Sequence, residues 1–596
     1  MHVIATAGHV DHGKSTLVRA LTGTEPDRWA EEQRRGLTID LGFAWLTTPS
    51  GREAAFVDVP GHERFIGNML AGLGPVPVVC FIVAADEGWR AQSAEHADAI
   101  AALGIQHGLV VISRCDLAPD RVTEVMAEAR AGLTHTGLRD APVVGVSAVT
   151  GTGMDDLRRT LDQVLARVPR PAVDDRVRMW LDRSFSINGA GTVVTGTLAG
   201  GTLAVGQQLD LASGEHTYAV TIRGLQRHGQ AHDRVGPVSR VAVNLRGRGA
   251  TEIHRGDVLI SPGAWPWTAT VDVRRVSGVP LDEVPVEVIA HVGTAAIPGR
   301  LRSFTDRHAR LTFTWPVPVV HADRIVLRHP GSRRVLGGVQ VADADPPALG
   351  RRGDAARRGQ VLAQLPAAGD LGYEVRRRGA VRQAHLVRLN LTAPHADPPD
   401  GIRAVGEWWI DGTVFAAWVD RLRDVVAQHH TEQPLSGGLT TSAVRDRLGM
   451  PDTALVPEVA AVAGLRLSDG LISDPAREAS LGRAEPGITA IEARLTARPF
   501  DAPETDDLIA LGIGARELAA AERLGRLLRL DDGVVLLPST PALAMRELSR
   551  LPQPFTTSEA RQALSTTRRI VIPLLEHLDR RGWTRRTDAQ HRVVVR

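Results

Sequence analysis

The fold of the N-terminal part of this chain is decided by the stretch Gly8-His9-Val10-Asp11-His12-Gly13-Lys14-Ser15. It fits the pattern G-x-x-x-x-G-K-[ST], follows a short apolar run (residues 3–5) and precedes a helix-like run (residues 16–21). Its glycines let the backbone curl so that N–H groups point at nucleotide phosphates, and the helix adds the positive end of its dipole. The Lys14 ammonium suits the β/γ-phosphates, and the Ser15 hydroxyl suits Mg²⁺. We therefore expect a phosphate-binding loop formed by Asp11, His12, Gly13, Lys14, Ser15 and Thr16.

The composition supports a functional role for this loop. Of the 70 Lys and Arg residues in the chain, Lys14 is the only lysine. A lysine ammonium is a compact point charge, whereas an arginine guanidinium is a planar fork. The one position that keeps lysine is therefore the position where a phosphate needs the compact charge.

The length of 596 residues predicts several domains, about four to seven at the usual domain size. A hydrophobic content of 43% and a charged content of 23% are typical of a soluble globular protein. No apolar run is long enough for a membrane span, and the N-terminus enters a strand-like run without a signal peptide. The two cysteines, Cys80 and Cys115, lie in apolar stretches and read as reduced packing residues. We expect a cytoplasmic protein without a membrane partner.

Residues 1–174 alternate apolar, strand-like runs with stretches of helical periodicity. The runs lie at residues 54–59, 78–84, 109–113 and 143–147. This alternation predicts an α/β domain with a doubly wound, mostly parallel sheet. Ligands bind at the carboxyl ends of the strands in such sheets, and the remaining motifs fall there.

Two motifs suit the γ-phosphate side of a nucleotide site. The polar stretch Arg35-Gly36-Leu37-Thr38-Ile39-Asp40 contains Thr38, a candidate Mg²⁺ ligand that would sense the γ-phosphate. The stretch Asp58-Val59-Pro60-Gly61-His62 follows the apolar run at 54–59. We expect Asp58 in the Mg²⁺ shell, the Gly61 N–H at the γ-phosphate, and His62 as the catalytic group that positions the attacking water. A single histidine after a turn is usually a surface residue, but this motif favours the catalytic role.

Two further motifs suit the base. The stretch Ser113-Arg114-Cys115-Asp116 stands where phosphate-loop GTPases read N/T-K-x-D, and the Asp116 carboxylate can accept two hydrogen bonds from guanine. Arg114 can cover the base with its stem and planar head, while Ser113 replaces an amide by a hydroxyl and leaves the usual bracing open. A plain turn at the strand end is the alternative. A fifth stretch resembles the loop that packs on the base: Ser147, Ala148 and Val149.

These motifs resemble those of translational GTPases. The stretches G-H-V-D-H-G-K, R-R-G-L-T-I-D-L-G and D-V-P-G-H-E-R-F-I-G-N-M-L-A-G are similar in detail to selenocysteine-specific elongation factors. The resemblance implies ribosome-stimulated hydrolysis of GTP to GDP with Mg²⁺. It also implies delivery of selenocysteinyl-tRNA to the ribosome at UGA codons marked by an mRNA hairpin. A metabolic kinase is the alternative for the phosphate loop alone, but it would not need the Thr38 and His62 motifs.

Residues 175–263 change to short β-rich alternation with regular turns, which predicts a small closed barrel, and residues 264–346 predict a second barrel. The runs L-D-R-S-F and G-A-G-T-V-V-T-G resemble domain two of the elongation-factor family. The resemblance implies a selenocysteine pocket formed by Asp182, Arg183 and Arg240. A selenol is more acidic than a thiol, so guanidinium groups favour its anion over neutral serine. A silent salt bridge on the barrel surface is the alternative.

Residues 347–596 are largely helical, with about four cycles of a few helices and a strand-like end, which predicts tandem winged helices. The last cycle, residues 539–596, has eleven arginines against five acidic residues. This segment resembles the RNA-binding end of the family, and pairing of arginines around a helix favours nucleic acid over a solvated basic face. The expected RNA-binding residues are Arg568, Arg569, Arg580, Arg581, Arg585 and Arg586.

Two other functions are compatible with parts of this pattern. A GTP-switched regulator with DNA-binding winged helices would usually dimerise for two half-sites, yet the sequence has no coiled coil and we expect a monomer. A general aminoacyl-tRNA carrier would not need the long basic helical array.

Overall fold

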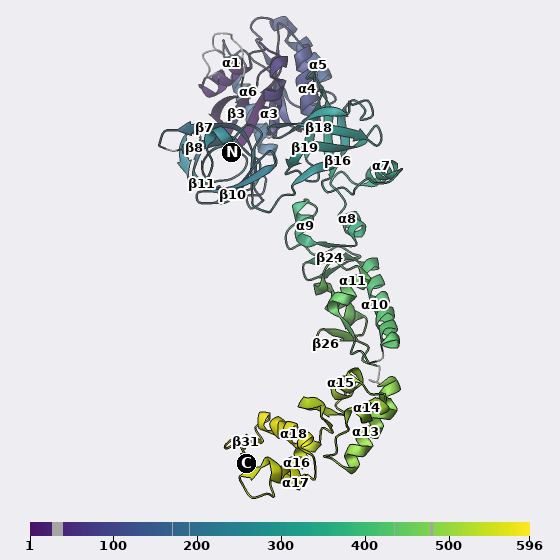
Figure 1. The fold of residues 1–596 in the computed structure, drawn as a ribbon. Helices are drawn as coiled ribbons and strands as arrows, with labels where there is room; N and C mark the ends of the chain where they lie inside the picture. The colour runs from purple at the N-terminus through teal and green to yellow at the C-terminus, as the bar shows by residue number, and fades with distance from the viewer. Residues whose placement is uncertain are drawn as a thin grey trace. The chain divides into compact units, whose positions relative to one another are not determined.

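The computed structural model describes the chain apart from residues 27–37, 39, 75, 170, 190, 434, 477–480 and 596. The chain forms two compact units, one of residues 1–374 with 382–397 and one of residues 375–381 with 398–596. Figure 1 shows the α/β part and the two barrels of the first unit, and the helices and short strands of the second. Of the predicted motif at 35–40, only Thr38 and Asp40 are among the described residues.

The first unit begins with a six-stranded sheet in the order β2-β3-β1-β4-β5-β6. All neighbouring strands pair in parallel except β2, which forms an antiparallel hairpin with β3. One cluster of buried residues joins the sheet to α1 and α6, and another joins its opposite face to α3, α4 and α5. The predicted doubly wound, mostly parallel sheet is therefore confirmed. Its elements are β1 (His2–Ala7), α1 (Lys14–Thr22), β2 (Gly42–Thr47), β3 (Glu53–Asp58), α3 (Ile66–Leu73), β4 (Val78–Ala84), α4 (Ala91–Leu103), β5 (His107–Ser113), α5 (Val122–Gly132), β6 (Val143–Gly145) and α6 (Met154–Arg167).

The central strand of this sheet shows why the alternation of elements is visible in the sequence. All seven residues of β4 are buried, because helices cover both faces of a doubly wound sheet. Such a strand is a continuous apolar run, so the predicted and observed bounds of β4 agree.

A ring of six antiparallel strands, β10-β15-β7-β8-β14-β11, closes through pairing of β11 with β10 and forms the first barrel. A short strand, β12, extends it, and β9 pairs with β13 beside it. The predicted barrel is confirmed. Its strands are β7 (Arg178–Ile187), β8 (Gly191–Leu198), β9 (Leu203–Ala204), β10 (Gln208–Ser213), β11 (His216–Arg227), β12 (Gln230–His232), β13 (Arg234–Val235), β14 (Ser239–Arg246) and β15 (Val258–Ile260).

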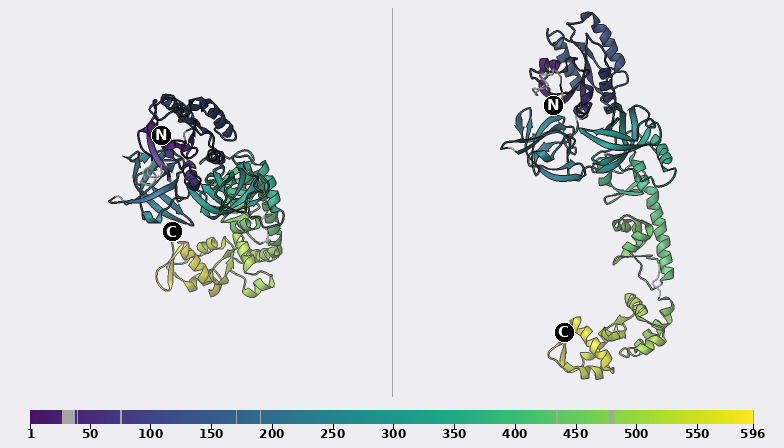
Figure 2. Two further views of the ribbon diagram at one scale, coloured as in Figure 1. Left: turned by 90° about the horizontal axis from the view of Figure 1, so that it is seen from above. Right: turned by 45° about the horizontal axis from the view of Figure 1, so that its top comes forward.

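The second barrel is a closed ring in the order β16-β19-β18-β17-β20-β21. It packs against α4 of the α/β domain, and its buried residues form one cluster with Trp180 of the first barrel. Figure 2 shows the two barrels next to each other in both orientations. Its strands are β16 (Thr268–Gly278), β17 (Glu287–Val292), β18 (Ala295–Ser303), β19 (His308–Val317), β20 (Arg324–Arg328) and β21 (Val335–Asp343). Helices α7 (Asp354–Gln364) and α9 (Gln383–Arg388) also belong to this unit.

The second unit repeats a pattern of helices followed by a small sheet, as expected for tandem winged helices. Four small sheets occur among its described residues, and the strand-like ends predicted near 405–410, 465–472, 527–537 and 583–595 are all hairpins. The buried residues form two clusters, one spanning residues 410–472 and one spanning 481–578. The last two cycles therefore share one core.

The elements of the second unit, with those that bridge the two units, are as follows: α8 (Leu371–Arg378), β22 (Ala380–Arg382), β23 (Ile402–Val405), β24 (Trp408–Asp411), α10 (Gly412–Glu432), β25 (Leu439–Thr440), α11 (Thr441–Leu448), α12 (Val456–Val462), β26 (Arg466–Ser468), β27 (Leu471–Ser473), α13 (Glu485–Ala497), α14 (Thr505–Ala510), α15 (Ala515–Arg523), β28 (Leu528–Arg529), β29 (Val535–Leu536), α16 (Thr540–Leu548), β30 (Phe555–Thr556), α17 (Thr557–Ala563), α18 (Arg568–Arg580), β31 (Thr584–Arg586) and β32 (His591–Val594).

Candidate GTP and aminoacyl-tRNA sites

The phosphate loop connects β1 to α1, and its last glycine sets the start of the helix. Gly13 has φ 77°, a left-handed conformation that glycine adopts without steric cost, and α1 begins at Lys14. The Lys14 ammonium donates to the carbonyls of Gly8 (3.1 Å) and His9 (2.6 Å). At the other end of the loop, the Gly8 N–H donates to Nδ1 of buried His96 at 3.0 Å. Both ends of the loop are thus fixed by hydrogen bonds.

The three predicted Mg²⁺ ligands come together. The Ser15 hydroxyl lies 3.0 Å from the Thr38 hydroxyl and donates to the Asp58 carboxylate at 2.7 Å. Thr6 of β1 donates to the other Asp58 oxygen at 2.6 Å. Burial raises the pKa of the Asp58 carboxyl, although the hydrogen bonds from Thr6 and Ser15 and the charge of Lys14 oppose that shift. Three oxygen ligands at one point form the donor set that Mg²⁺ prefers.

Gly61 and His62 follow β3 beside the phosphate loop. A Cβ atom at Gly61 would lie 2.7 Å from the backbone nitrogen of Val10 in the phosphate loop, so only glycine allows this close approach. The Arg64 N–H donates to Nδ1 of His62 at 3.2 Å. In this arrangement Nδ1 is the acceptor and Nε2 carries the proton of the neutral ring. The imidazole of His62 is therefore fixed on one side and half-exposed on the other.

The base side of the site is held to the phosphate loop by the two residues that depart from the usual motif. The Ser113 hydroxyl donates to the His12 carbonyl at 2.7 Å, and the Arg114 guanidinium donates to the Asp11 carbonyl. Arg114 also pairs with Asp86 (3.2 Å) and Glu87 (3.3 Å). Both Asp11 and Arg114 have positive φ, 63° and 54°, a strained conformation that is common at functional sites.

The other base-side residues lie at the same edge of the sheet. Asp116 is exposed two residues beyond Arg114. In the loop after β6, Ser147 is buried and its hydroxyl accepts a hydrogen bond from the Thr150 N–H at 3.1 Å. Ala148 is half-buried and Val149 is exposed. The loop therefore presents Val149 to any ligand that occupies this edge.

In the first barrel, the structure brings Asp182 and Arg240 together. Arg240 donates to both Asp182 oxygens, at 2.6 Å for the bond from Nη2 to Oδ1, and to the Thr195 hydroxyl at 3.1 Å. Both side chains of the ion pair are buried. Arg183 points elsewhere and donates to Asp40 (3.2 Å) and to the Leu41 carbonyl. The predicted pocket therefore contains one arginine neutralised within the barrel and one neutralised by the α/β domain.

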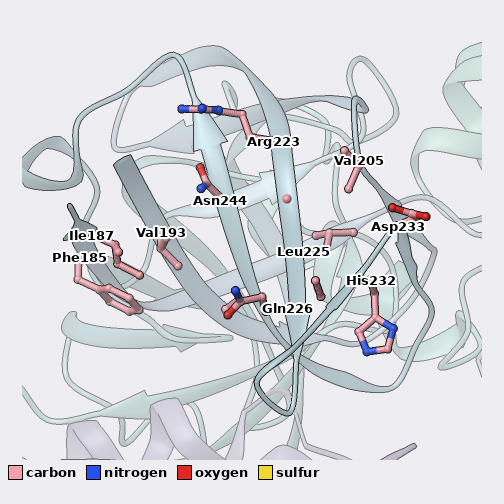
Figure 3. A pocket seen from close by; sticks show the side chains of 13 residues that line it. Phe185, Ile187, Val193, Val205, Arg223, Leu225, Gln226, His232, Asp233 and Asn244 are labelled. Atoms are coloured by element: carbon pink, nitrogen blue, oxygen red, sulfur yellow. The ribbon is translucent and has the colours of Figure 1, made fainter. Parts of the chain in front are cut away.

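A cavity of about 440 Å³ lies farther along β7, β8 and β14, the strands that carry Asp182, Thr195 and Arg240. Figure 3 shows Phe185, Ile187 and Val193 at one end of it and His232 and Asp233 at the other. The amide side chains of Gln226 and Asn244 also line it. Strands β7, β8 and β14 carry Asp182, Thr195 and Arg240 of the polar cluster, and the same three strands also line this cavity, with Phe185 and Ile187, Val193, and Ala242 and Asn244. Because strands rise about 3.3 Å per residue, the two sites lie on the order of 10 Å apart.

The six predicted RNA-binding arginines fall into two groups. Arg569 donates to the carbonyls of Ala502 (2.9 Å) and Pro503, Arg580 pairs with Asp531 (2.7 Å), and Arg586 approaches two acidic residues of α18. The other three, which make no ion pair with any described residue, are Arg568, Arg581 and Arg585. Trp583 lies between the last two and is 37% exposed, with the Arg581 guanidinium 5.9 Å from its ring centre.

Two residues that contact these sites, Asp40 and Arg255, are not indicated by the sequence motifs. The structure shows that Arg255 donates to Asp40 (2.6 Å) and to Asn68 of α3 (2.7 Å). These contacts join residues that are far apart in the chain, so no local pattern could have indicated them.

Comparison with known proteins identifies the family. The family model "Elongation factor Tu GTP binding domain" matches residues 1–167. The model "Selenocysteine-specific elongation factor, beta-barrel domain" matches residues 269–348, and "Elongation factor SelB, winged helix" matches residues 546–593. The chain is 30% identical to the selenocysteine-specific elongation factor of Desulfomicrobium baculatum, with 100% of both chains covered. It is 31% identical to that of Escherichia coli (strain K12), covering 99% of this chain and 98% of the relative. The chain belongs to the family of selenocysteine-specific elongation factors.

The fold is similar along the whole length to a crystal structure of a bacterial selenocysteine-specific elongation factor. The TM-score is 0.77 with 24% identity, and 100% of each chain is covered. As a family member, the chain is a translational GTPase that binds GTP and GDP. Among the described residues, none of the helices has the length and apolar character of a membrane span.

Proposed function

We propose that this elongation factor delivers selenocysteinyl-tRNA to the ribosome, with hydrolysis of GTP, at UGA codons marked by an mRNA hairpin. The proposal rests on the arginine pocket of the first barrel, where Arg183 of β7 and Arg240 of β14 lie on either side of β8, with both guanidinium groups over the ring of Phe43 of the α/β domain. A selenol is more acidic than a thiol, whose reference pKa is about 8.5, so its anion prevails at neutral pH. Guanidinium groups favour that anion, whereas the neutral hydroxyl of serine gains little from them.

The cavity beside this pocket suits the end of a tRNA. Its apolar wall of Phe185, Ile187 and Val193 can pack on the face of an unpaired base, and the amides of Gln226 and Asn244 can hydrogen-bond to base edges. The amino acid of an aminoacyl-tRNA is attached next to its terminal base. A single acceptor end could therefore occupy the cavity and the arginine pocket together, because the two share strands β7, β8 and β14.

The nucleotide site has the groups that GTP hydrolysis needs. Ser15, Thr38 and Asp58 would hold Mg²⁺, which neutralises phosphate charge when it is bound. Lys14 and the N–H groups of residues 11–16 and Gly61 would bind the phosphates. His62, fixed through Nδ1, would orient the attacking water through the opposite side of its ring. Asp116, Arg114 and the loop at 147–149 would bind guanine.

The C-terminal cycle suits a hairpin RNA better than duplex DNA. Arg568, Arg581 and Arg585 are available for phosphates, and Trp583 offers an aromatic face on which an unpaired base can stack. Stacking of this kind is used for loops and bulges, whose bases are not already stacked in a helix. A GTP-switched DNA regulator would have no use for the arginine pocket of the barrel, and a general carrier would have no use for this RNA end.

We also propose domain limits at 1–174, 175–263, 264–346 and 347–596, a cytoplasmic location and a monomeric state. These limits fall just before β7 (from Arg178), β16 (from Thr268) and α7 (from Asp354), although α7 and α9 pack with the first compact unit.

The decisive experiment compares two tRNAs of identical sequence, one charged with selenocysteine and the other with serine. Arg183→Ala is the first variant, because this side chain is partly exposed and its loss leaves no unpaired group in the barrel core. Loss of one charge-assisted contact should cost about 1.5–3 kcal/mol, which is roughly ten- to 150-fold in the Kd of selenocysteinyl-tRNA. The Kd of seryl-tRNA should change by less than about threefold.

The control is Arg227→Ala, which removes another arginine of the same barrel, one that pairs with Glu53 away from the pocket. It should affect both tRNAs little. Equal losses for both tRNAs with Arg183→Ala would mean that this arginine holds the tRNA backbone. No loss for either would contradict the proposed pocket.

A further inference from the structure

Asp40 is held by two arginines of the first barrel. Its Oδ2 accepts a hydrogen bond from Nη2 of Arg183 at 3.2 Å, and its Oδ1 accepts one from Nη2 of Arg255 at 2.6 Å. Arg255 also donates to the Asp182 carbonyl (3.1 Å) and to Asn68 (2.7 Å). One carboxylate of the α/β domain therefore joins Arg183 of the arginine pocket to Arg255 beside that pocket.

The chain around Asp40 links this carboxylate to the nucleotide site. Asp40 is two residues after Thr38, whose hydroxyl lies 3.0 Å from that of Ser15. Two peptide units span at most about 7 Å, so Thr38 and Asp40 stay within that distance of each other, and a larger displacement of Thr38 moves Asp40 as well. Strand β2 follows at once, and its residue Phe43 lies under the guanidinium groups of Arg240 (4.0 Å) and Arg183 (5.0 Å).

The two pocket arginines differ in the number of N–H donors that remain for a ligand. Arg240 uses both of its Nη groups on Asp182 and Thr195. Arg183 uses only Nη2 on the described part of the chain, for Asp40 and the Leu41 carbonyl. Its Nε and Nη1 groups remain available on a guanidinium that Asp40 keeps in one orientation. Arg183 is thus the pocket arginine that an anionic side chain can reach.

We propose that Asp40 is a positioning residue that couples the nucleotide to the selenocysteine pocket. When Thr38 is engaged at the nucleotide, the Asp40 carboxylate orients Arg183 and Arg255, so that Arg183 presents its remaining donors to the selenolate. When Thr38 is released, Asp40 releases both arginines and the preference for selenocysteine falls. This inference rests on the proposed function, because it assumes that the pocket binds selenocysteine.

The contacts of Asp40 suit this role. Each of its two carboxylate oxygens accepts a hydrogen bond from a different guanidinium group, one from Arg183 and one from Arg255. Coupling through such a contact is reciprocal, so bound selenocysteinyl-tRNA should in turn favour the engaged position of Thr38.

The test measures the Kd of selenocysteinyl-tRNA and of seryl-tRNA in the presence of a non-hydrolysable GTP analogue and of GDP. In Asp40→Asn, the ratio of the Kd with GDP to the Kd with the analogue should fall by about tenfold for selenocysteinyl-tRNA, within the usual range of allosteric coupling. The ratio should fall because selenocysteinyl-tRNA binds more weakly to the analogue-bound form, while its Kd for the GDP-bound form changes little. Seryl-tRNA should lose much less, because a neutral hydroxyl gains little from an oriented guanidinium. Affinity for the analogue itself should stay within about threefold, which also shows that the variant is folded.

Two further variants make the result specific. Glu53→Gln removes another ion pair between the same two parts of the chain, that with Arg227 (3.2 Å), and should leave both ratios unchanged. Asp40→Glu keeps the charge on a longer side chain, so its Kd ratio should fall less than that of Asp40→Asn. Where Asp40→Asn fails to fold, the smaller fall expected in Asp40→Glu, compared with the unmodified protein, tests the inference by itself. Equal weakening of both tRNAs by the Asp40 variants, or an unchanged nucleotide ratio, would overturn the inference. If the unmodified protein shows no preference for selenocysteinyl-tRNA, the proposed function itself fails, and that outcome is separate.

Discussion

The hydroxyl of Ser113 donates a hydrogen bond to the backbone carbonyl of His12 at 2.7 Å, across the gap between β5 and the phosphate loop. The shorter side chain therefore still braces the base side of the site against the phosphate side. Loss of one buried neutral hydrogen bond costs about 1 kcal/mol, so we expect Ser113→Ala to weaken GDP binding by roughly fivefold. Fluorescence titration with a labelled GDP measures this change.

Ser113→Thr is the matched control, because it keeps the hydroxyl, and it should bind GDP with an affinity close to that of the unmodified protein. If Ser113→Ala binds GDP as well as Ser113→Thr does, the hydrogen bond to His12 does not brace the site.

The second prediction concerns the base. Asp116 lies exposed at the end of β5, where its carboxylate can accept hydrogen bonds from guanine. Asp116→Asn replaces an acceptor by an amide donor, which meets the donors of guanine unfavourably. We expect GTP binding to be lost and xanthosine triphosphate to bind in its place. Competition between the two nucleotides measures the switch, and retained GTP preference would show that another group reads the base.

The third prediction concerns hydrolysis. His62 is fixed through the hydrogen bond from the Arg64 N–H to its Nδ1, which leaves the other side of the ring for water. His62→Ala should leave GTP affinity within a few-fold and lower ribosome-stimulated turnover by orders of magnitude, since water positioning matters only in the transition state. Single-turnover phosphate release with saturating ribosomes is the measurement. Near-normal release would assign water positioning to a different residue.

The fold could be predicted where helices and strands alternate, and less well elsewhere. Strand β4 is buried on both faces and is visible as one apolar run. The sequence pattern does not indicate strand β2. This strand joins β3 in an antiparallel hairpin, so no helix separates the two strands as it would in a βαβ unit. In the second unit the alternation was correctly predicted, but the common core of the last two cycles depends on contacts between distant helices that periodicity does not encode.

The same limit applies to the site. The phosphate loop and its neighbours have fixed local spacing, so Lys14, Ser15, Asp58 and His62 could be named from the sequence. The pairing of Arg255 with Asp40 joins residues 215 positions apart, and no local pattern indicates it. Charge clustering likewise cannot distinguish Arg569, which donates to backbone carbonyls of the neighbouring cycle, from arginines without such partners.

The fourth prediction concerns pH. His96 is buried and its Nδ1 accepts the Gly8 N–H; burial, with a smaller effect from the charge of Lys14, lowers the pKa of the ring to about 3. The folded chain therefore keeps His96 neutral, whereas the unfolded chain protonates it below about pH 6.5. The stabilisation is complete above that pH and is lost as the pH falls toward 3. At pH 5 the loss from this ring is about 2 kcal/mol.

His96→Gln keeps a hydrogen-bond acceptor for Gly8 but does not titrate. We expect the drop in Tm between pH 7.5 and pH 5 to be smaller in this variant than in the unmodified protein. His12 is also buried, and burial lowers its pKa to about 3. It is present in both proteins, so its contribution to the drop in Tm is the same in both and serves as the internal reference. An identical drop in both proteins would show that His96 is not held neutral.

The last prediction concerns the RNA end, where exposed Trp583 lies between Arg581 and Arg585. Stacking of one base on an aromatic side chain contributes about 1–3 kcal/mol, so Trp583→Ala should weaken binding of the mRNA hairpin by roughly five- to 150-fold. Because no charge is lost, the salt dependence of binding should not change.

Arg581→Ala and Arg585→Ala should each weaken binding and lower the salt slope by about 1. Arg569→Ala, which loses hydrogen bonds to the Ala502 and Pro503 carbonyls, should lower the Tm instead. Filter binding across a salt series, with duplex DNA as competitor, separates these effects. Competition by duplex DNA as strong as that by the hairpin would favour the regulator over the RNA-guided elongation factor.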